Sequence, residues 1–234
     1  MTRNKIIYFL FVGAVLCGCT ANKSHYIGEK YIGKQYLNNP LGEEKQPDPD
    51  PLIRQDAFDC TTFVETTLAD GNVKKLNAIR YKNGDIDFVN RNHFIELDWL
   101  QNNQDIVENV SNLYGKTAIR TVIIDKKSWF KKNYNIDTEF EKRTVNLEYI
   151  PYENLSNLDI QTPLIVLFVH DGHKFKEKIG TDLAVVHMGF LLPDGTLRHA
   201  SRRYGRVMDT DFMEYVSEHR HNKHNIGIVL VKIK

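Results

Sequence analysis

The 234-residue chain has few cysteines and no strong excess of charge of either sign. It carries 31 lysines and arginines against 30 aspartates and glutamates, and no basic stripe indicates a nucleic-acid partner. It contains no low-complexity tract and no internal repeat. An apolar run at residues 6–16 is too short to span a bilayer comfortably. These absences leave an ordinary globular chain with enough residues for one domain.

The amino terminus has the order of a bacterial export signal. Arg3 and Lys5 precede the apolar run, which leads into Leu-Cys-Gly-Cys at residues 16–19. This ending resembles the lipobox of bacterial lipoproteins, in which a small residue precedes the cysteine that receives the lipid. We therefore expect a lipoprotein signal peptide at residues 1–18, a lipid on Cys19 and a tether at residues 19–25. That anchor would hold the protein on a membrane of the bacterial cell envelope, on the periplasmic or outer-membrane face. A plain secretory signal is the alternative.

Cleavage before Cys19 would leave Cys60 as the only thiol of the exported chain. Exported proteins usually pair their cysteines, so a single unpaired cysteine is unexpected unless its thiol is used. The structural alternative is a cysteine buried in the core.

The remaining residues, 26–234, predict one α+β domain with an insertion around residues 72–160. Apolar spacing indicates a helix near residues 25–32, and four prolines make residues 38–51 a loop. A helix follows Asp59, which is a good amino-terminal cap. Strands are expected at residues 121–124, 164–169, 184–192, 196–201 and 226–233, with a short helix at 211–219. Helices first and an antiparallel sheet afterwards are typical of the α+β class.

Cys60 lies at the predicted helix start. There the helix dipole and unpaired backbone N–H groups favour a thiolate, which predicts a lowered pKa for the Cys60 thiol. The same N–H groups can stabilise an oxyanion on a substrate carbonyl.

The predicted hairpin supplies a base for this cysteine. A three-residue loop at residues 193–195, Pro-Asp-Gly, pairs strand residues whose numbers sum to 388. Gly189 then faces His199, and His187 lies on the same sheet face, diagonal to His199 and roughly 7–8 Å away. His187 would be the base and His199 the group that orients it. A two-residue loop would place the histidines on opposite faces.

The order of these motifs resembles a known group of enzymes. Residues 59–64 (Asp-Cys-Thr-Thr-Phe-Val), 187–191 (His-Met-Gly-Phe-Leu) and 199–201 (His-Ala-Ser) are similar to motifs of the NlpC-type, papain-like cell-wall hydrolases. The chain most resembles the N-acetylmuramoyl-L-alanine amidase-like family, in which a Thr-Thr pair follows the cysteine. Residues 91–94 (Arg-Asn-His-Phe) and 98–99 (Asp-Trp) match a downstream segment of that family.

The resemblance implies an α+β papain-like fold in which a helix-borne cysteine packs on an antiparallel sheet. Cys60 would attack an amide of peptidoglycan or a muropeptide, with His187 and His199 completing the triad and with no metal or cofactor. Tyr36 would lie near the cysteine and polarise the carbonyl, or else serve only in packing. The residues assigned to the substrate groove, with a structural cluster as the alternative, are Asp59, Arg91, His93 and Trp99.

Three other functions remain open at this stage. A zinc site could use His170 and His173, or His219, His221 and His224. A non-catalytic envelope-binding lipoprotein could retain a hydrolase fold. An endopeptidase would use the same catalytic residues to cut between D-glutamate and the diamino acid of the peptidoglycan stem.

Overall fold

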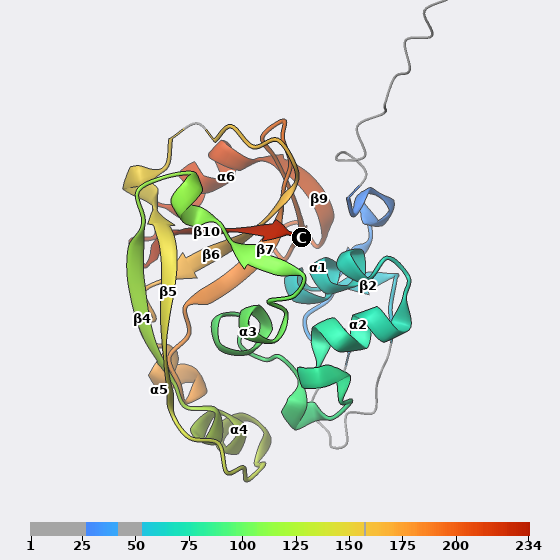
Figure 1. Cartoon of the computed structure of the whole chain (residues 1–234), viewed down its shortest axis with the longest axis vertical. Helices are drawn as coiled ribbons and strands as arrows, with labels where there is room; N and C mark the ends of the chain where they lie inside the picture. The colour runs from blue at the N-terminus through green and yellow to red at the C-terminus, as the bar shows by residue number, and fades with distance from the viewer. Residues whose placement is uncertain (1–26, 42–52, 157) are drawn as a thin grey trace, which may run out of the picture.

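The computed structural model describes residues 27–41, 53–156 and 158–234 (Figure 1). The expected signal peptide, the Cys19 lipidation site and the tether at residues 19–25 lie outside the described residues, as does most of the proline-containing loop. Across the three described ranges, no helix has both the length and the apolar character needed to cross a bilayer.

The fold is built on a mixed, mostly antiparallel sheet. Along the sheet the strands follow the order β2-β1-β9-β8-β7-β6-β10-β5-β4, and β3 pairs with β10 off this path. Only β1 and β2, among the described pairs, run parallel. The strands are β1 (Gln35–Tyr36), β2 (Ala57–Phe58), β3 (Val107–Asn109), β4 (Ala118–Ile124), β5 (Arg143–Pro151), β6 (Leu164–His170), β7 (Val185–Leu191), β8 (Thr196–Ser201), β9 (Arg206–Asp211) and β10 (Asn225–Ile233).

The described helices are short and lie between these strands in the chain. The α-helices are α1 (Cys60–Ala69), α2 (Val73–Arg80), α3 (Leu100–Asn102), α4 (Lys126–Tyr134), α5 (Phe175–Ile179) and α6 (Phe212–His219). A π-helix covers Ile95–Trp99, and 3-10 turns cover Glu29–Tyr31, Lys82–Gly84, Phe88–Asn90, Ser111–Leu113 and Tyr152–Asn154. The predicted α+β class is confirmed.

Two hydrophobic clusters form because residues alternate between the two faces of the sheet. Phe63 of α1 packs edge-on against Phe190 of β7, with ring centroids 5.6 Å apart, in the larger cluster. Leu191, the next residue of β7, belongs to the second cluster together with Val216 of α6. Figure 1 shows α1 and α2 together on one side of the molecule and α6 on another. One face of β7 therefore contributes to the cluster that contains α1, and the other face contributes to the cluster that contains α6.

Each strand expected in the second half of the sequence is present, and so is the helix that ends at His219. The helix expected near residues 25–32 is wrong within the described part, which shows only the 3-10 turn Glu29–Tyr31. Gly28 and Gly33 flank that turn with φ values of 68° and 84°, outside the helical region, and β1 follows.

The middle segment, residues 72–160, extends the sheet. Strand β5 pairs with β10, and β4 pairs with β5 over seven residues. Since β10 is the last strand of the chain, this segment is joined to the carboxyl-terminal half by backbone hydrogen bonds.

Candidate active site

Cys60 is the first residue of α1, and the helix starts there because its first turn is capped. The Asp59 carboxylate accepts hydrogen bonds from the backbone N–H and the hydroxyl of Thr62, each at 2.8 Å. The same hydroxyl accepts a bond from the Asp59 backbone N–H at 3.0 Å. This reciprocal capping box fixes a set of N–H groups beside Cys60 that have no partner inside the helix. The predicted helix start and its cap are confirmed.

The protonation state of the thiol differs from the prediction. Cys60 keeps some solvent exposure as a residue, but its sulfur is closely surrounded, and burial raises the pKa of the Cys60 thiol to about 12. The neighbouring Asp59 charge raises this pKa further, whereas hydrogen bonds from Thr61 and from the Met188 backbone lower it. The cost of desolvating the thiolate therefore outweighs the stabilisation that the helix start gives to it. With this pKa, Cys60 is a neutral thiol in the free protein.

The hairpin of β7 and β8 has the predicted register. Phe190 pairs with Arg198 and Leu191 with Leu197, so the numbers of each pair sum to 388. The loop closes with Leu192 donating to the Thr196 carbonyl at 2.8 Å. Gly195 occupies the left-handed region with φ of 84°, which a three-residue loop requires. The expected three-residue loop is confirmed.

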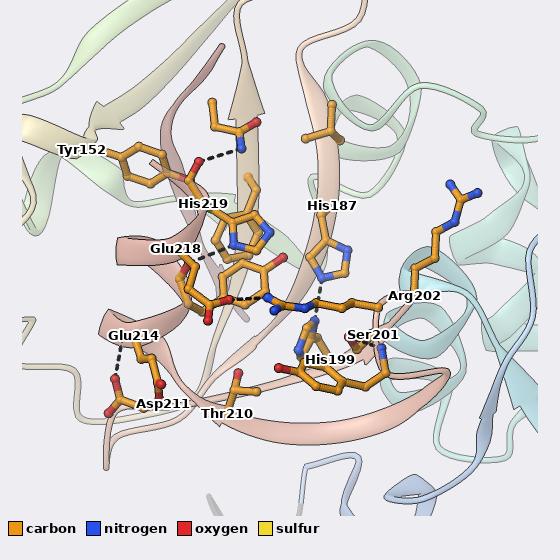
Figure 2. A pocket seen from close by; sticks show the side chains of 16 residues that line it. Tyr152, His187, His199, Ser201, Arg202, Thr210, Asp211, Glu214, Glu218 and His219 are labelled. Atoms are coloured by element: carbon orange, nitrogen blue, oxygen red, sulfur yellow. Dashed lines mark hydrogen bonds and ion pairs between the residues drawn. The ribbon is translucent and has the colours of Figure 1, made fainter. Parts of the chain in front are cut away.

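His187 and His199 lie in direct contact because of this register. The Nε2 atom of His187 and the Nδ1 atom of His199 are 2.8 Å apart. Figure 2 marks this contact with a dashed line. Gly189 leaves room for this contact, since a Cβ atom there would lie 2.9 Å from the Cβ of His199. The predicted placement of the two histidines on one face is confirmed.

Both imidazoles are neutral near pH 7. Burial lowers the pKa of His187 well below its usual range, and the nearby His199 and His219 lower it further. Burial likewise lowers the pKa of His199 to about 4. A neutral imidazole carries one proton, so one ring donates and the other accepts in the contact between them. A neutral His187 is able to accept a proton.

The Cys60 thiol lies beside the strand that carries His187. The hydrogen-bond ladder between β7 and β8 covers only the two pairs nearest the turn, so β8 does not pair the backbone of Met188. That backbone group instead hydrogen-bonds to the Cys60 thiol. Tyr36 and Tyr215 are also close enough for the charge of the Cys60 thiolate to raise their pKa values. The thiol thus meets β7 one residue away from His187.

A pocket of about 670 Å³ lies against the two histidines, between α6 and the turn that joins β8 to β9 (Figure 2). We call it the α6 pocket. It is lined by Tyr152, Phe168, Val186, His187, His199, Ser201, Arg202, Arg203, Tyr204, Thr210, Asp211, Glu214, Tyr215, Glu218, His219 and Asn225. Its volume is typical of small-molecule sites.

Three of the residues expected in the substrate groove share a different cavity. Asp59, Arg91 and His93 line a space of about 90 Å³ behind the first turn of α1. The buried ion pair between Arg80 and Glu65, at 3.1 Å, lines it as well. These three residues therefore lie together in a small polar cavity and do not line the α6 pocket, and their role in a substrate groove stays a prediction.

His93 and Trp99 have packing surroundings. His93 is packed against the rings of Phe88, Trp129 and Phe130, and burial lowers its pKa to about 3. Trp99 is fully buried in the π-helix. These contacts agree with the structural alternative for both residues.

Tyr36 lies near Cys60, as expected. It is half-buried in β1, and burial raises the pKa of its phenol to about 12, with the nearby thiol and Asp59 contributing. The phenol is therefore protonated and able to donate a hydrogen bond.

Several residues beside the two histidines and before β7 were not predicted from the sequence. Tyr215 and His219 stack on each other in α6, with ring centroids 3.7 Å apart, beside His187. Their spacing of four residues on one helix face was the available signal. Glu96, fully buried in the π-helix, accepts a hydrogen bond from the Ala184 backbone N–H at 2.6 Å and so holds the chain just before β7. No pattern of neighbouring residues in the sequence predicts this hydrogen bond between distant segments.

The other histidines considered for zinc make different contacts. The rings of His173 and His224 stack in parallel 4.1 Å apart, and His224 contacts the Asp171 carboxylate at 2.8 Å. His170 accepts a hydrogen bond from the Gly172 backbone. Over the described residues, no group of three or more histidine, cysteine or acidic side chains is arranged to hold a metal ion.

A comparison of the sequence with models of known protein families identifies the family of this chain. The model of the AmiA-like family, described as N-acetylmuramoyl-L-alanine amidase-like, matches residues 26–226. The chain belongs to this family. The match spans all three motifs, so the resemblance inferred from them is confirmed. No curated protein matches the chain.

Solved structures similar to this member of the AmiA-like family support the fold. Protein LPG0564 of Legionella pneumophila, from the DUF1460 family, is 24% identical with a TM-score of 0.79, over 90% of this chain and 88% of that one. An N-acetylmuramoyl-L-alanine amidase from Bacteroides uniformis is 22% identical with a TM-score of 0.67, over 88% of this chain and 97% of that one. A proposed xylanase from Bacteroides fragilis is 23% identical with a TM-score of 0.68, over 88% and 98%. These names differ, and at such identities the likeness shows the fold alone.

Proposed function

We propose that this protein is a peptidoglycan amide hydrolase, an N-acetylmuramoyl-L-alanine amidase with a papain-like fold of the NlpC type. The 2.8 Å contact between His187 and His199, on the strand whose backbone meets the Cys60 thiol, is the observation that carries the proposal. It supplies a thiol, a neutral base and a group that orients the base, which are the parts of a cysteine hydrolase. Membership of the amidase-like family supports peptidoglycan as the substrate.

The first step is a proton transfer coupled to attack. Since the Cys60 thiol is neutral at rest, its proton passes to the second ring nitrogen of His187, which points away from His199 in Figure 2. The sulfur then bonds to the lactyl carbonyl carbon of N-acetylmuramic acid, and the carbonyl electron pair moves to oxygen. The N–H groups at the start of α1 stabilise that oxyanion, and the Tyr36 phenol is placed to assist them.

The tetrahedral intermediate breaks down when protonated His187 gives its proton to the nitrogen of L-alanine. The C–N bond breaks, the stem peptide leaves with a free amino terminus, and a thioester to Cys60 remains. His187 then takes a proton from water, the hydroxide attacks the thioester, and the released thiolate recovers the proton. His199 keeps the ring of His187 oriented throughout, the role of the third group in such triads.

We also propose that the protein acts in the bacterial cell envelope. The export signal and the lipobox-like residues 16–19 support this location, with the lipid attached to Cys19.

The test is digestion of purified peptidoglycan followed by mass spectrometry of the fragments. We expect products with a free L-alanine amino terminus. Cys60→Ala and His187→Ala should each lower the rate by about 10³-fold or more, while His199→Ala leaves measurable activity. His173→Ala, which removes a histidine that stacks on His224 and does not line the α6 pocket, is the matched control and should digest normally.

The same digest identifies the competing functions. A freed amine on the diamino acid would make the enzyme an endopeptidase. Binding of peptidoglycan without soluble fragments would make it a binding lipoprotein. Turnover by the Cys60→Ala protein would disprove the nucleophile assignment, provided that circular dichroism shows every variant folded.

A further inference from the structure

We infer that the α6 pocket binds the N-acetylated sugar of the substrate, and that the stem peptide extends from Cys60 in the other direction. This inference rests on the proposed function, which gives the scissile carbonyl a sugar on one side and a peptide on the other. His187 and His199 form part of the pocket wall, so a substrate held between Cys60 and His187 has one end beside this pocket.

The charges around the pocket favour an uncharged ligand. Two arginines line it against three carboxylates. Arg203 is paired with Glu218 at 2.6 Å, which leaves the two carboxylates of Asp211 and Glu214 and one arginine, Arg202, around the pocket. A stem peptide carries carboxylates on D-glutamate and on the diamino acid and would meet repulsion there. An N-acetyl sugar carries no charge once its lactyl group is in amide linkage.

Arg202 lies on the side where the peptide would extend. Its charge acts on the Tyr36 phenol, the neighbour of Cys60. Figure 2 shows its side chain reaching away from Glu214 and Asp211. Beside Cys60 the Asp59 carboxylate is already hydrogen-bonded to Thr62, and the positive charge of Arg202 lies toward Tyr36. The pocket carboxylates that have no ion pair among the described residues, Asp211 and Glu214, line the side of α6. An anionic peptide fits the first environment better than the second.

The walls of the α6 pocket suit a sugar ring. They combine aromatic faces with a few polar groups, a lining that buries the apolar face of a ligand and fixes its orientation. The aromatic side chains are Tyr152, Phe168, Tyr204, Tyr215 and His219.

Some buried polar atoms of the residues that line this pocket make no hydrogen bond within the described residues. The Tyr152 hydroxyl, the Thr210 hydroxyl and the Nε2 atom of His199 have no hydrogen-bond partner within the described part of the chain. Because buried polar groups are nearly always paired, ring hydroxyls and an acetamido group would supply what these atoms lack, after a small adjustment of the wall.

The binding test uses a bulky substitution that fills the pocket, and it compares the affinities of two ligands. One is the disaccharide of N-acetylglucosamine and N-acetylmuramic acid, with its lactyl group capped as the methyl amide. The other is the free stem tripeptide. Both are titrated by calorimetry into the Cys60→Ala protein, which lacks the proposed nucleophile. Adding Glu214→Trp should weaken disaccharide binding by about tenfold or more and leave tripeptide binding unchanged.

Met213→Trp is the matched control, because Met213 is the adjacent residue of α6 and lines a separate cavity beside the turn at residues 193–195. It should change neither titration. Tyr204→Ala, which removes an exposed aromatic side chain from the pocket wall, is a second test variant and should also weaken the disaccharide. Failure of the disaccharide to bind, or weakening of the tripeptide instead, would overturn the inference.

A kinetic test separates this inference from the proposed function. With Cys60 intact, Glu214→Trp should lower kcat/KM for a muramoyl peptide by about tenfold and leave unchanged the hydrolysis of a lactoyl peptide that lacks the sugar. Equal losses on both substrates would sink the pocket assignment alone. Disaccharide binding that responds to Glu214→Trp, in a protein that cleaves neither substrate, would sink the amidase proposal alone.

Discussion

The neutral state of Cys60 follows from competition between two opposite effects on one sulfur atom. The start of α1 favours a thiolate, and the packing around the sulfur favours the thiol. Packing prevails, and the pKa of the Cys60 thiol rises to about 12. In the proposed mechanism the ion pair of Cys60 and His187 therefore forms only as substrate is bound, since burial also favours a neutral His187.

We expect slow alkylation of Cys60 in the free protein. Only the thiolate reacts, so the rate with iodoacetamide should rise about tenfold per pH unit from pH 7 to about pH 10. An ordinary cysteine would level off near its pKa of about 8.5. Peptide mass spectrometry after timed labelling measures the reaction at Cys60. A plateau below pH 9 would show that the helix start lowers the pKa of the Cys60 thiol by more than burial raises it.

Glu96 predicts a dependence of stability on pH. Burial raises the pKa of its carboxyl to about 7, despite hydrogen bonds from the Ala184 and Val185 backbone. The folded protein therefore holds a proton that the unfolded chain releases near pH 4.5. This contribution to stability is fully present below about pH 4.5 and is lost as the pH rises through 7, with a total of ~3 kcal/mol.

The comparison of wild type with Glu96→Gln isolates this effect, because glutamine keeps the acceptor and cannot ionise. Urea unfolding from pH 4 to 8 should show the free energy of unfolding of wild type falling relative to the variant as pH rises. A parallel pH dependence of the two proteins would contradict the assignment.

At the scale of elements, the loop of the β7–β8 hairpin determines how His187 and His199 lie relative to each other. The three-residue loop fixes the register, and the register fixes which face each histidine occupies. Strand β7 needs Gly189 where it passes His199, since a Cβ there would lie 2.8 Å from the Arg198 carbonyl oxygen.

Gly189→Ala should therefore destabilise the protein by ~1–3 kcal/mol and displace His199 from His187. Thermal unfolding measures the first effect, and the hydrolysis rate measures the second. Gly115→Ala is the control, because its Cβ would meet a side-chain methyl of Ile150 at 3.2 Å, away from the histidines. A fully active and stable Gly189→Ala protein would contradict the role given to this close approach.

Over the whole molecule, the sheet joins parts of the chain that are far apart in sequence. Strands β1 and β2 precede Cys60 and attach beside β9, so α1 lies against β7 and β8. Strand β10 then joins the middle segment to β6. The candidate site therefore forms only when both halves of the chain are folded.

Attachment to a membrane is the prediction that belongs to the whole chain. Cys19→Ser should move the protein from the membrane fraction to the soluble fraction of bacteria that express it, because a lipid-bearing cysteine is then absent. Immunoblotting of the two fractions checks this, and Cys17→Ser is the matched control that should stay with the membrane. A Cys19→Ser protein that stays with the membrane would contradict lipidation at Cys19, and wild-type protein found in the soluble fraction would favour the plain secretory signal.

The sequence by itself determined the features that depend on neighbours in the chain. The cap at Asp59, the helix start at Cys60, the hairpin loop and the shared face of His187 and His199 each follow from a few adjacent residues, because hydrogen bonding and side-chain alternation are local rules. The tertiary structure decided how deeply those residues are buried and what they meet from distant segments. It raised the pKa of Cys60, placed Trp99 in the core and brought α6 beside the histidines, because desolvation and pocket shape arise only when the whole sheet is assembled.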